Sequence, residues 1–230
     1  MTAFIFDIDG TIIDSMPTHD RAWGVFLARH GRAFDNADFF HRTAGRTGVE
    51  VMRELFGPLS DAHAHELVQE KEILYRELFA PIFREVAGFA VFARAAHAAG
   101  IALGCATAGD AGNIAFALHH LGMQKFFGAL AGGHEVQHGK PAPDIFLLAA
   151  ARMEVDPTDC VVFEDAPLGI EGAARAGMTA VAMTTTVSAD ELTGPHVIIA
   201  LADYRGAEPR DIAARAVQQR QRQRMLRTGT

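Results

Sequence analysis

The chain has 230 residues, of which 49% are hydrophobic and 21% are charged, a composition typical of a globular protein with a real core. This length suits one domain with a sizeable insertion. The formal net charge of −7 argues against nucleic acid as the main partner, but a local cation could still favour a phosphorylated substrate.

Neither end of the sequence suggests export or membrane insertion. Asp7 and Asp9 fall within the first ten residues, which does not fit a signal peptide, and no apolar run approaches a membrane span. Cys105 and Cys160 lie in apolar runs, so we expect buried free thiols in a reducing compartment. These features predict a cytoplasmic protein with no membrane partner.

An apolar run at residues 3–8 predicts a strand that is buried on both faces of a parallel sheet. Asp7 and Asp9 interrupt its end, and the period of a strand would point both to the same side. Two such carboxylates repel each other, and a divalent cation is the usual compensation. Gly10 allows a sharp turn directly afterwards. The alternative is a strand that happens to end in a polar turn.

Residues 15–83 show helical patterns without an intervening strand. Ser15 is the candidate N-cap of the first helix, and Pro17 lies in its first turn. The expected helices span residues 15–30, 35–43, 48–56 and 60–83. This pattern predicts a helical insertion placed directly after the first strand.

From residue 88 onward, expected strands alternate with helices of about ten residues. The strands are expected at residues 101–106, 127–131, 160–163, 179–183 and 197–200. The helices are expected at residues 89–99, 111–121, 143–153 and 168–176. This alternation predicts an α/β fold with a doubly wound parallel sheet and helices on both faces. The arginine- and glutamine-rich tail from residue 207 is expected to be a solvated helix or a frayed end.

Polar side chains follow several of these strands. In an open parallel sheet, ligands bind outside the carboxyl ends of the strands, so these side chains should meet. Each is weak evidence alone, because Thr107 could cap a helix and Lys140 could be solvated. Together they bring several carboxylates, one hydroxyl and one ammonium group to one edge, which fits Mg²⁺ with a phosphate group. The residues are Asp7, Asp9, Thr107, Lys140, Glu164 and Asp165.

In order and spacing, these residues resemble the four motifs of the haloacid dehalogenase superfamily. The motifs are Asp-Ile-Asp-Gly-Thr at residues 7–11, Thr107, Lys140 in Gly-Lys-Pro-Ala-Pro-Asp, and Glu164-Asp165. The resemblance covers residues 3 to about 203 and implies a Rossmann-like, doubly wound parallel sheet core with an inserted α-helical cap domain. The implied division is a core of residues 1–14 and 84–205, a cap of residues 15–83, and a basic tail of residues 206–230.

The resemblance also implies roles in phosphoryl transfer. Asp7 would be the nucleophile that forms an aspartyl-phosphate, and Asp9 would be the general acid and then the general base. Thr107 and Lys140 would bind the phosphoryl oxygens. Next to these motifs, Asp110 is expected to cap a helix together with Asn113, although both could instead line the pocket.

The cofactor implied by the resemblance is Mg²⁺. Its ligands would be the carboxylate of Asp7, the backbone carbonyl of Asp9, and Asp165. Glu164 would be a further ligand or a hydrogen-bonding partner of the ligands.

Within the cap, residues 19–23, 45–47 and 71–75 resemble the substrate-facing residues of β-phosphoglucomutase and its sugar-phosphatase relatives. The substrate-binding residues expected from this are Thr11, His19, Arg46 and Lys71. Arg46 suits a second phosphate or hydroxyl groups. Alternatively, His19 caps a helix turn and Lys71 is solvated.

The leading hypothesis is a Mg²⁺-dependent phosphatase of small phosphomonoesters, especially sugar phosphates. The alternative is a mutase of the β-phosphoglucomutase kind, whose members tend to carry valine at the position of Thr11. A haloacid dehalogenase needs neither Asp9 nor a metal, and an inactive binding module would lack Asp7 or Asp9. The expected partner is a small phosphorylated metabolite, with no nucleic acid or membrane, and the expected assembly is a monomer or weak dimer.

Overall fold

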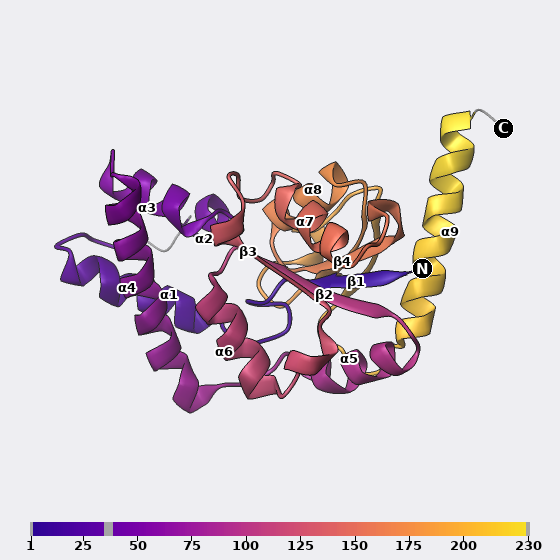
Figure 1. Ribbon diagram of the computed structural model, residues 1–230, viewed down its shortest axis with the longest axis horizontal. Helices are drawn as coiled ribbons and strands as arrows, with labels where there is room; N and C mark the ends of the chain where they lie inside the picture. The colour runs from indigo at the N-terminus through magenta and orange to yellow at the C-terminus, as the bar shows by residue number, and fades with distance from the viewer. Residues whose placement is uncertain (1, 35–38, 229–230) are drawn as a thin grey trace.

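The computed structural model describes residues 2–34 and 39–228. Six parallel strands form one sheet in the order β3-β2-β1-β4-β5-β6 (Figure 1). The strands are β1 Ala3–Phe6, β2 Ala102–Thr107, β3 Ala129–Gly132, β4 Cys160–Glu164, β5 Thr179–Met183 and β6 Val197–Leu201. The chain winds outward from β1 in one direction through β2 and β3, and in the other through β4 to β6. The strand order therefore reverses at β1, where ligands bind in such sheets.

Helices cover both faces of the sheet, as the alternating pattern predicted (Figure 1). One face carries α5 Phe89–Ala98, α6 Ala111–Leu121 and α9 Pro209–Thr228, and the other carries α7 Asp144–Arg152 and α8 Pro167–Arg175. Because consecutive strand residues point to opposite faces, Phe4 and Phe6 enter one apolar core and Ile5 enters the other. Both cysteines are buried free thiols, which confirms the prediction.

The helices between β1 and α5 lie beside the carboxyl end of the sheet (Figure 1). They are α1 Met16–Arg29, α2 Phe39–Thr43, α3 Gly48–Phe56 and α4 Asp61–Phe79. α4 packs against both α1 and α3. The helix expected at 60–83 ends earlier, because Pro81 cannot continue it, and a 3₁₀ turn Ala80–Ile82 follows. Of the helix expected at 35–43, residues 35–38 lie outside the described residues.

The C-terminal segment packs more closely than the sequence suggested. Ile212 and Ala216 of α9 are buried in the main core, and Arg220 donates to Asp159 at 2.5 Å. The segment is the expected helix and most of its described side chains are exposed, but its first part is not frayed, because one face packs on the core. Among the described residues, no helix combines the length and the apolar character needed to cross a membrane.

The first strand ends two residues earlier than predicted. The carbonyl of Ile8 accepts the backbone N–H groups of Thr11, Ile12 and Ile13, so the chain turns tightly there. Gly10 supports this turn with a φ of +74°. Asp9 therefore belongs to a turn and not to the strand, and contacts from other elements decide where its carboxylate points.

Candidate active site

A cavity lies between the carboxyl end of the sheet and the inserted helices. The ends of the strands and the loops after them bring together the residues singled out by the motifs, and the helical insertion adds three of the four residues expected to bind substrate. The lining includes Asp7, Asp9, Thr107, Lys140, Glu164 and Asp165 from the sheet side. From the insertion it includes His19 of α1, Lys71 of α4, and Arg46 of the loop between α2 and α3. Of the residues predicted from the sequence, Thr11 is the one that the lining of this cavity does not contain.

Lys140 joins two of the carboxylates at the base of the cavity. Its Nζ donates to Oδ1 of Asp7 at 2.6 Å and also donates to Oε1 of Glu164. Burial alone would lower the pKa of Lys140, but Asp7 and Glu164 outweigh that effect and raise the pKa. The backbone N–H of Lys140 donates to the carbonyl of Gly45 at 2.9 Å, which links this loop to the inserted helices. The ammonium group is therefore fixed and charged.

The carboxylate of Glu164 is fully engaged. One oxygen accepts from Lys140, and the other accepts the backbone N–H of Ala166 at 3.1 Å. A Cβ at Gly169 would lie 2.0 Å from the carboxyl carbon of Glu164, so only glycine leaves room for it. This arrangement suits a group that orients Lys140.

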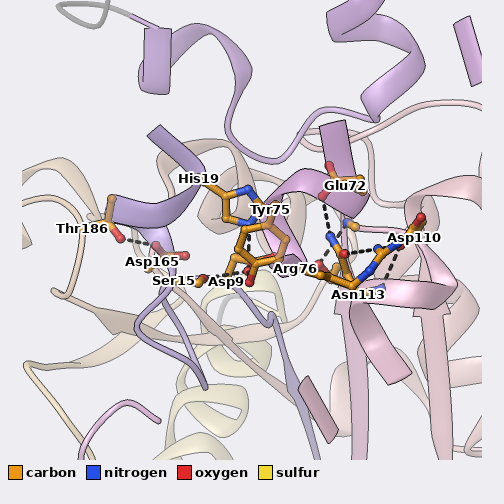
Figure 2. Close-up of polar contacts among 12 residues, drawn as sticks. Asp9, Ser15, His19, Glu72, Tyr75, Arg76, Asp110, Asn113, Asp165 and Thr186 are labelled. Carbon is orange, nitrogen blue, oxygen red and sulfur yellow. Dashed lines mark hydrogen bonds and ion pairs between the residues drawn. The ribbon is translucent and has the colours of Figure 1, made fainter. Parts of the chain in front are cut away.

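Two threonines hold the carboxylate of Asp165. Thr186 donates to Oδ2 (Figure 2), and Thr11 donates to Oδ1 at 3.3 Å. Thr11 is fully buried and does not line the cavity, and its hydroxyl contacts Asp165, which does. Any effect of Thr11 on substrate would therefore pass through Asp165. Sequence reasoning missed Thr186, since a threonine in a loop beyond β5 carries no motif signal.

The charges at the base of the cavity fit a divalent cation. Three buried carboxylates, those of Asp7, Glu164 and Asp165, face the single ammonium group of Lys140, so two negative charges are uncompensated. Burial, reinforced by the other two carboxylates against Lys140, raises the pKa of Asp7 well above its usual range. Burial and Glu164 raise the pKa of Asp165 to about 7. A bound divalent cation would reverse both effects.

The described residues contain no preformed cage of three or more His, Cys, Asp or Glu side chains. This agrees with the position of Lys140, which occupies one oxygen each of Asp7 and Glu164. Oδ2 of Asp7 is free of the contact with Lys140, and Asp165 is held by neutral hydroxyl groups instead of an ammonium group. Among the described residues, these two carboxylates are therefore the ones best able to hold the cation. The predicted contribution of the Asp9 carbonyl remains a prediction.

Asp9 is held by residues of the helical insertion (Figure 2). Its Oδ1 accepts from Ser15 Oγ at 2.7 Å and from Tyr75 Oη at 3.0 Å. His19 Nε2 lies 3.0 Å from the same oxygen, without the alignment of a hydrogen bond. Burial would raise the pKa of Asp9, but its contacts with His19, Ser15 and Lys71 hold the pKa well below its usual range. Ser15 thus serves Asp9 and gives α1 no side-chain cap, contrary to the prediction.

Lys71 is buried and not solvated, which excludes the alternative reading of this residue. Its Nζ lies 2.8 Å from Nδ1 of His19 and donates to Oε1 of Glu72 at 2.9 Å. Its charge also lies 4.8 Å from the centre of the Trp23 ring. Because an ammonium group can only donate, Nδ1 of His19 accepts and the proton of the ring lies on Nε2, which faces Asp9.

Arg46 lines the cavity, but its guanidinium is already engaged. Its Nη1 donates to Oε2 of Glu54 and to the carbonyl of Arg42 at 3.2 Å. The two cations that the inserted helices bring to the cavity, Arg46 and Lys71, are thus each paired with a glutamate.

Asp110 caps α6, as expected, by accepting the backbone N–H of Asn113 at 2.8 Å. Asn113 itself lines the cavity and donates to Oε2 of Glu72 at 2.7 Å, and Nη1 of Arg76 donates to Oδ1 of Asn113 at 2.7 Å (Figure 2). Glu72 and Tyr75 fall within residues 71–75, which the resemblance singled out, but sequence reasoning assigned neither a role of its own, and it missed Arg76. Their helical spacing was the available signal, because positions three and four apart share a face.

Comparisons with known proteins agree with this geometry. A family model described as haloacid dehalogenase-like hydrolase matches residues 1–177. The fructose-1-phosphate phosphatase YqaB of Escherichia coli is 36% identical over 177 residues, covering 77% of this chain and 93% of that protein. The β-phosphoglucomutase of Bacillus subtilis is 32% identical over 189 residues, covering 79% of this chain and 82% of that protein.

A solved structure also resembles the whole chain. The HAD hydrolase of family IA, variant 3, from Entamoeba histolytica has a TM-score of 0.81 and 27% identity, and the match covers 94% of this chain and 99% of that one. The likeness therefore includes the inserted helices as well as the sheet. The motif residues meet at one edge of the sheet, and the family model matches most of the chain. This chain therefore belongs to the haloacid dehalogenase-like hydrolases.

Proposed function

We propose that this protein is a Mg²⁺-dependent phosphatase of small phosphomonoesters, with sugar phosphates as its main substrates. The observation that carries the proposal is the buried contact of 2.6 Å between Lys140 and Asp7 at the base of the cavity. It supplies a nucleophile and a fixed cation at the same point. The sugar-phosphate class is suggested by the relatives, which include a phosphatase of fructose 1-phosphate.

In the first step, a carboxylate oxygen of Asp7 attacks phosphorus while the bond from phosphorus to the leaving oxygen breaks. For this step Asp9 must be protonated when the substrate binds, although its contacts in the free site favour the ionised form. It gives that proton to the leaving oxygen, so the product leaves as an alcohol. Lys140 and Thr107, which both line the cavity, would stabilise the charge on the phosphoryl oxygens, Lys140 by its own charge and Thr107 by a hydrogen bond. The product of this step is an aspartyl-phosphate on Asp7.

In the second step, Asp9 takes a proton from water while the water oxygen attacks phosphorus. The bond between phosphorus and Asp7 breaks, which restores the carboxylate of Asp7 and releases inorganic phosphate. Mg²⁺, held by Asp7 and Asp165, would neutralise phosphoryl charge and keep Asp7 ionised.

The charges of the helical insertion favour a phosphatase over a mutase. A mutase passes the phosphoryl group to a hydroxyl of a sugar monophosphate, so its cavity must hold a sugar with two phosphates. The second phosphate would need an unpaired cation, but Arg46 and Lys71 already face Glu54 and Glu72. Asp20, also in the lining, adds a further negative charge. This part of the cavity suits the hydroxyl groups of a monophosphate.

The decisive experiment is a phosphate-release screen over sugar phosphates, including fructose 1-phosphate, run beside an assay for conversion of glucose 1-phosphate to glucose 6-phosphate. We expect phosphate release that requires Mg²⁺ and stops with a chelator. Faster isomer formation than phosphate release would favour the mutase instead, and activity without a metal would refute this mechanism.

Asp7→Asn tests the nucleophile. We expect it to abolish phosphate release, because an amide cannot form the aspartyl-phosphate. The matched control is Asp190→Asn, since Asp190 is an exposed aspartate outside the cavity lining. Turnover that survives in Asp7→Asn would show that another group attacks phosphorus.

A further inference from the structure

The two oxygens of the Asp9 carboxylate have different surroundings. Oδ1 receives the hydroxyl groups of Ser15 and Tyr75 and the contact from His19 (Figure 2). Among the described residues, the contacts of the Asp9 side chain are all made by Oδ1. Both hydroxyl groups donate to Oδ1, which is the acceptor in each contact.

Tyr75 is set rigidly for this contact. Its side chain is 1% exposed, and its ring stacks on His19 at 3.7 Å between centroids and on Phe79 at 5.7 Å. The two stacked rings leave the phenol little freedom to swing. Tyr75 belongs to α4, so its hydroxyl reaches from the helical insertion to the loop that follows β1.

We propose that Tyr75 is a positioning residue, whose hydroxyl occupies Oδ1 of Asp9 so that Oδ2 is the oxygen that transfers the proton to and from the substrate. This inference rests on the proposed phosphatase function. Ser15, Tyr75 and His19 take up Oδ1, so Oδ2 is the oxygen of Asp9 that is left to exchange a proton with the leaving oxygen as the bond to phosphorus breaks.

The test is Tyr75→Phe, which keeps the stacked ring and removes only the hydroxyl. Its effect is read as kcat/KM with two substrates, because this ratio reports on the steps up to departure of the leaving group. A sugar phosphate has a poor leaving group that needs the proton from Asp9, whereas p-nitrophenol leaves as a stable anion. We expect kcat/KM to fall about tenfold for the sugar phosphate and less than about twofold for p-nitrophenyl phosphate.

The matched control is Tyr204→Phe. Tyr204 is equally buried in the sheet core, and its hydroxyl has no hydrogen-bond partner among the described residues. We expect the control to leave the ratio of the two kcat/KM values unchanged. Ser15→Ala, which removes the second hydroxyl on Oδ1, should change the ratio in the same direction as Tyr75→Phe.

If kcat/KM of Tyr75→Phe falls equally for both substrates, the role of Tyr75 is merely structural and the proposal is overturned. The proposal is also overturned if kcat/KM falls for neither substrate. Thermal melting of each variant identifies any loss of activity that comes from unfolding. A different outcome concerns the proposed function: if the unaltered protein releases phosphate from neither substrate, the phosphatase assignment fails, and the role of Tyr75 fails with it.

Discussion

Two glycines lack the side chains that would otherwise collide with charged residues of the cavity. A Cβ at Gly10 would lie 2.0 Å from Oδ2 of Asp165, and one at Gly45 would lie 3.0 Å from Cβ of Lys140. Real side chains essentially never approach as closely as the first of these distances. The motif around Asp7 predicted a turn at Gly10, but only the structure shows that this glycine also makes room for the carboxylate of Asp165, directly after β4.

Gly10→Ala should therefore remove both stability and activity. The residue has a φ of +74°, and the new methyl group would displace Asp165, so we expect a loss of about 2 kcal/mol or more in the free energy of unfolding and loss of phosphate release. Gly31→Ala is the control, because Gly31 has a φ of +67° but nothing within 4 Å of its Cβ position. In the Gly31→Ala variant, the free energy of unfolding measured in urea should fall by only about 1 kcal/mol, and phosphate release should be retained. Similar activity in both variants would contradict the steric argument.

Thr186→Val tests how Asp165 is held. The change removes the hydroxyl that donates to Oδ2 of Asp165 and keeps the volume of the side chain. Because partners that orient metal ligands affect metal affinity, we expect the Mg²⁺ concentration for half-maximal activity to rise about tenfold. Thr193→Val, at an exposed threonine outside this cavity, should leave it unchanged. An unaltered Mg²⁺ requirement in Thr186→Val would exclude this role.

At the scale of whole elements, α4 connects the helical insertion to the sheet domain. Along one face it presents Gln69, which donates to Asp110 at 2.9 Å, and Arg76, which donates to Asn113 at 2.7 Å. A turn before Arg76, Glu72 accepts from the same Asn113. These partners belong to α6, so polar side chains hold the two helices together beside the cavity.

Arg76→Met should weaken this connection. It leaves Oδ1 of Asn113 without its partner in a poorly solvated place, so we expect the free energy of unfolding to fall by about 1 to 2 kcal/mol. Arg84→Met is the control, since the ion pair of Arg84 with Asp14 is exposed and worth less than about 1 kcal/mol. Urea unfolding of both variants measures the difference. If the free energy of unfolding fell equally in both variants, the contact between α4 and α6 would contribute no more to stability than an exposed ion pair.

At the scale of the whole molecule, both cysteines report on global unfolding. Cys105 lies in β2 and Cys160 begins β4, and both are almost fully buried. Burial raises the pKa of each thiol to about 12, so neither forms the reactive thiolate at neutral pH.

We therefore expect iodoacetamide to leave both thiols unmodified in the native protein at pH 7.5 and to modify both in denaturing urea. Mass spectrometry of the intact chain counts the additions. Modification of either thiol under native conditions, at the rate of an exposed cysteine, would contradict the packing of the sheet core.

Local patterns were sufficient for most of the architecture. The helices expected at 48–56 and 111–121 and the strand expected at 179–183 match α3, α6 and β5 at both ends. Their periodicity, caps and glycine stops all act within a few residues, so each can be recognised from neighbouring positions alone. The packing of the inner face of α9 could not be predicted, because burial of Ile212 and Ala216 depends on a sheet face built by distant segments.

The sequence by itself determined the fold class and which motif residues meet, because the carboxyl ends of parallel strands share one edge. Only the tertiary structure decided how the charges pair. Lys140 serves Asp7 and Glu164 together, Arg46 is engaged by Glu54, and Tyr75 reaches Asp9 from 66 positions away. Such contacts depend on packing between elements that no local pattern encodes.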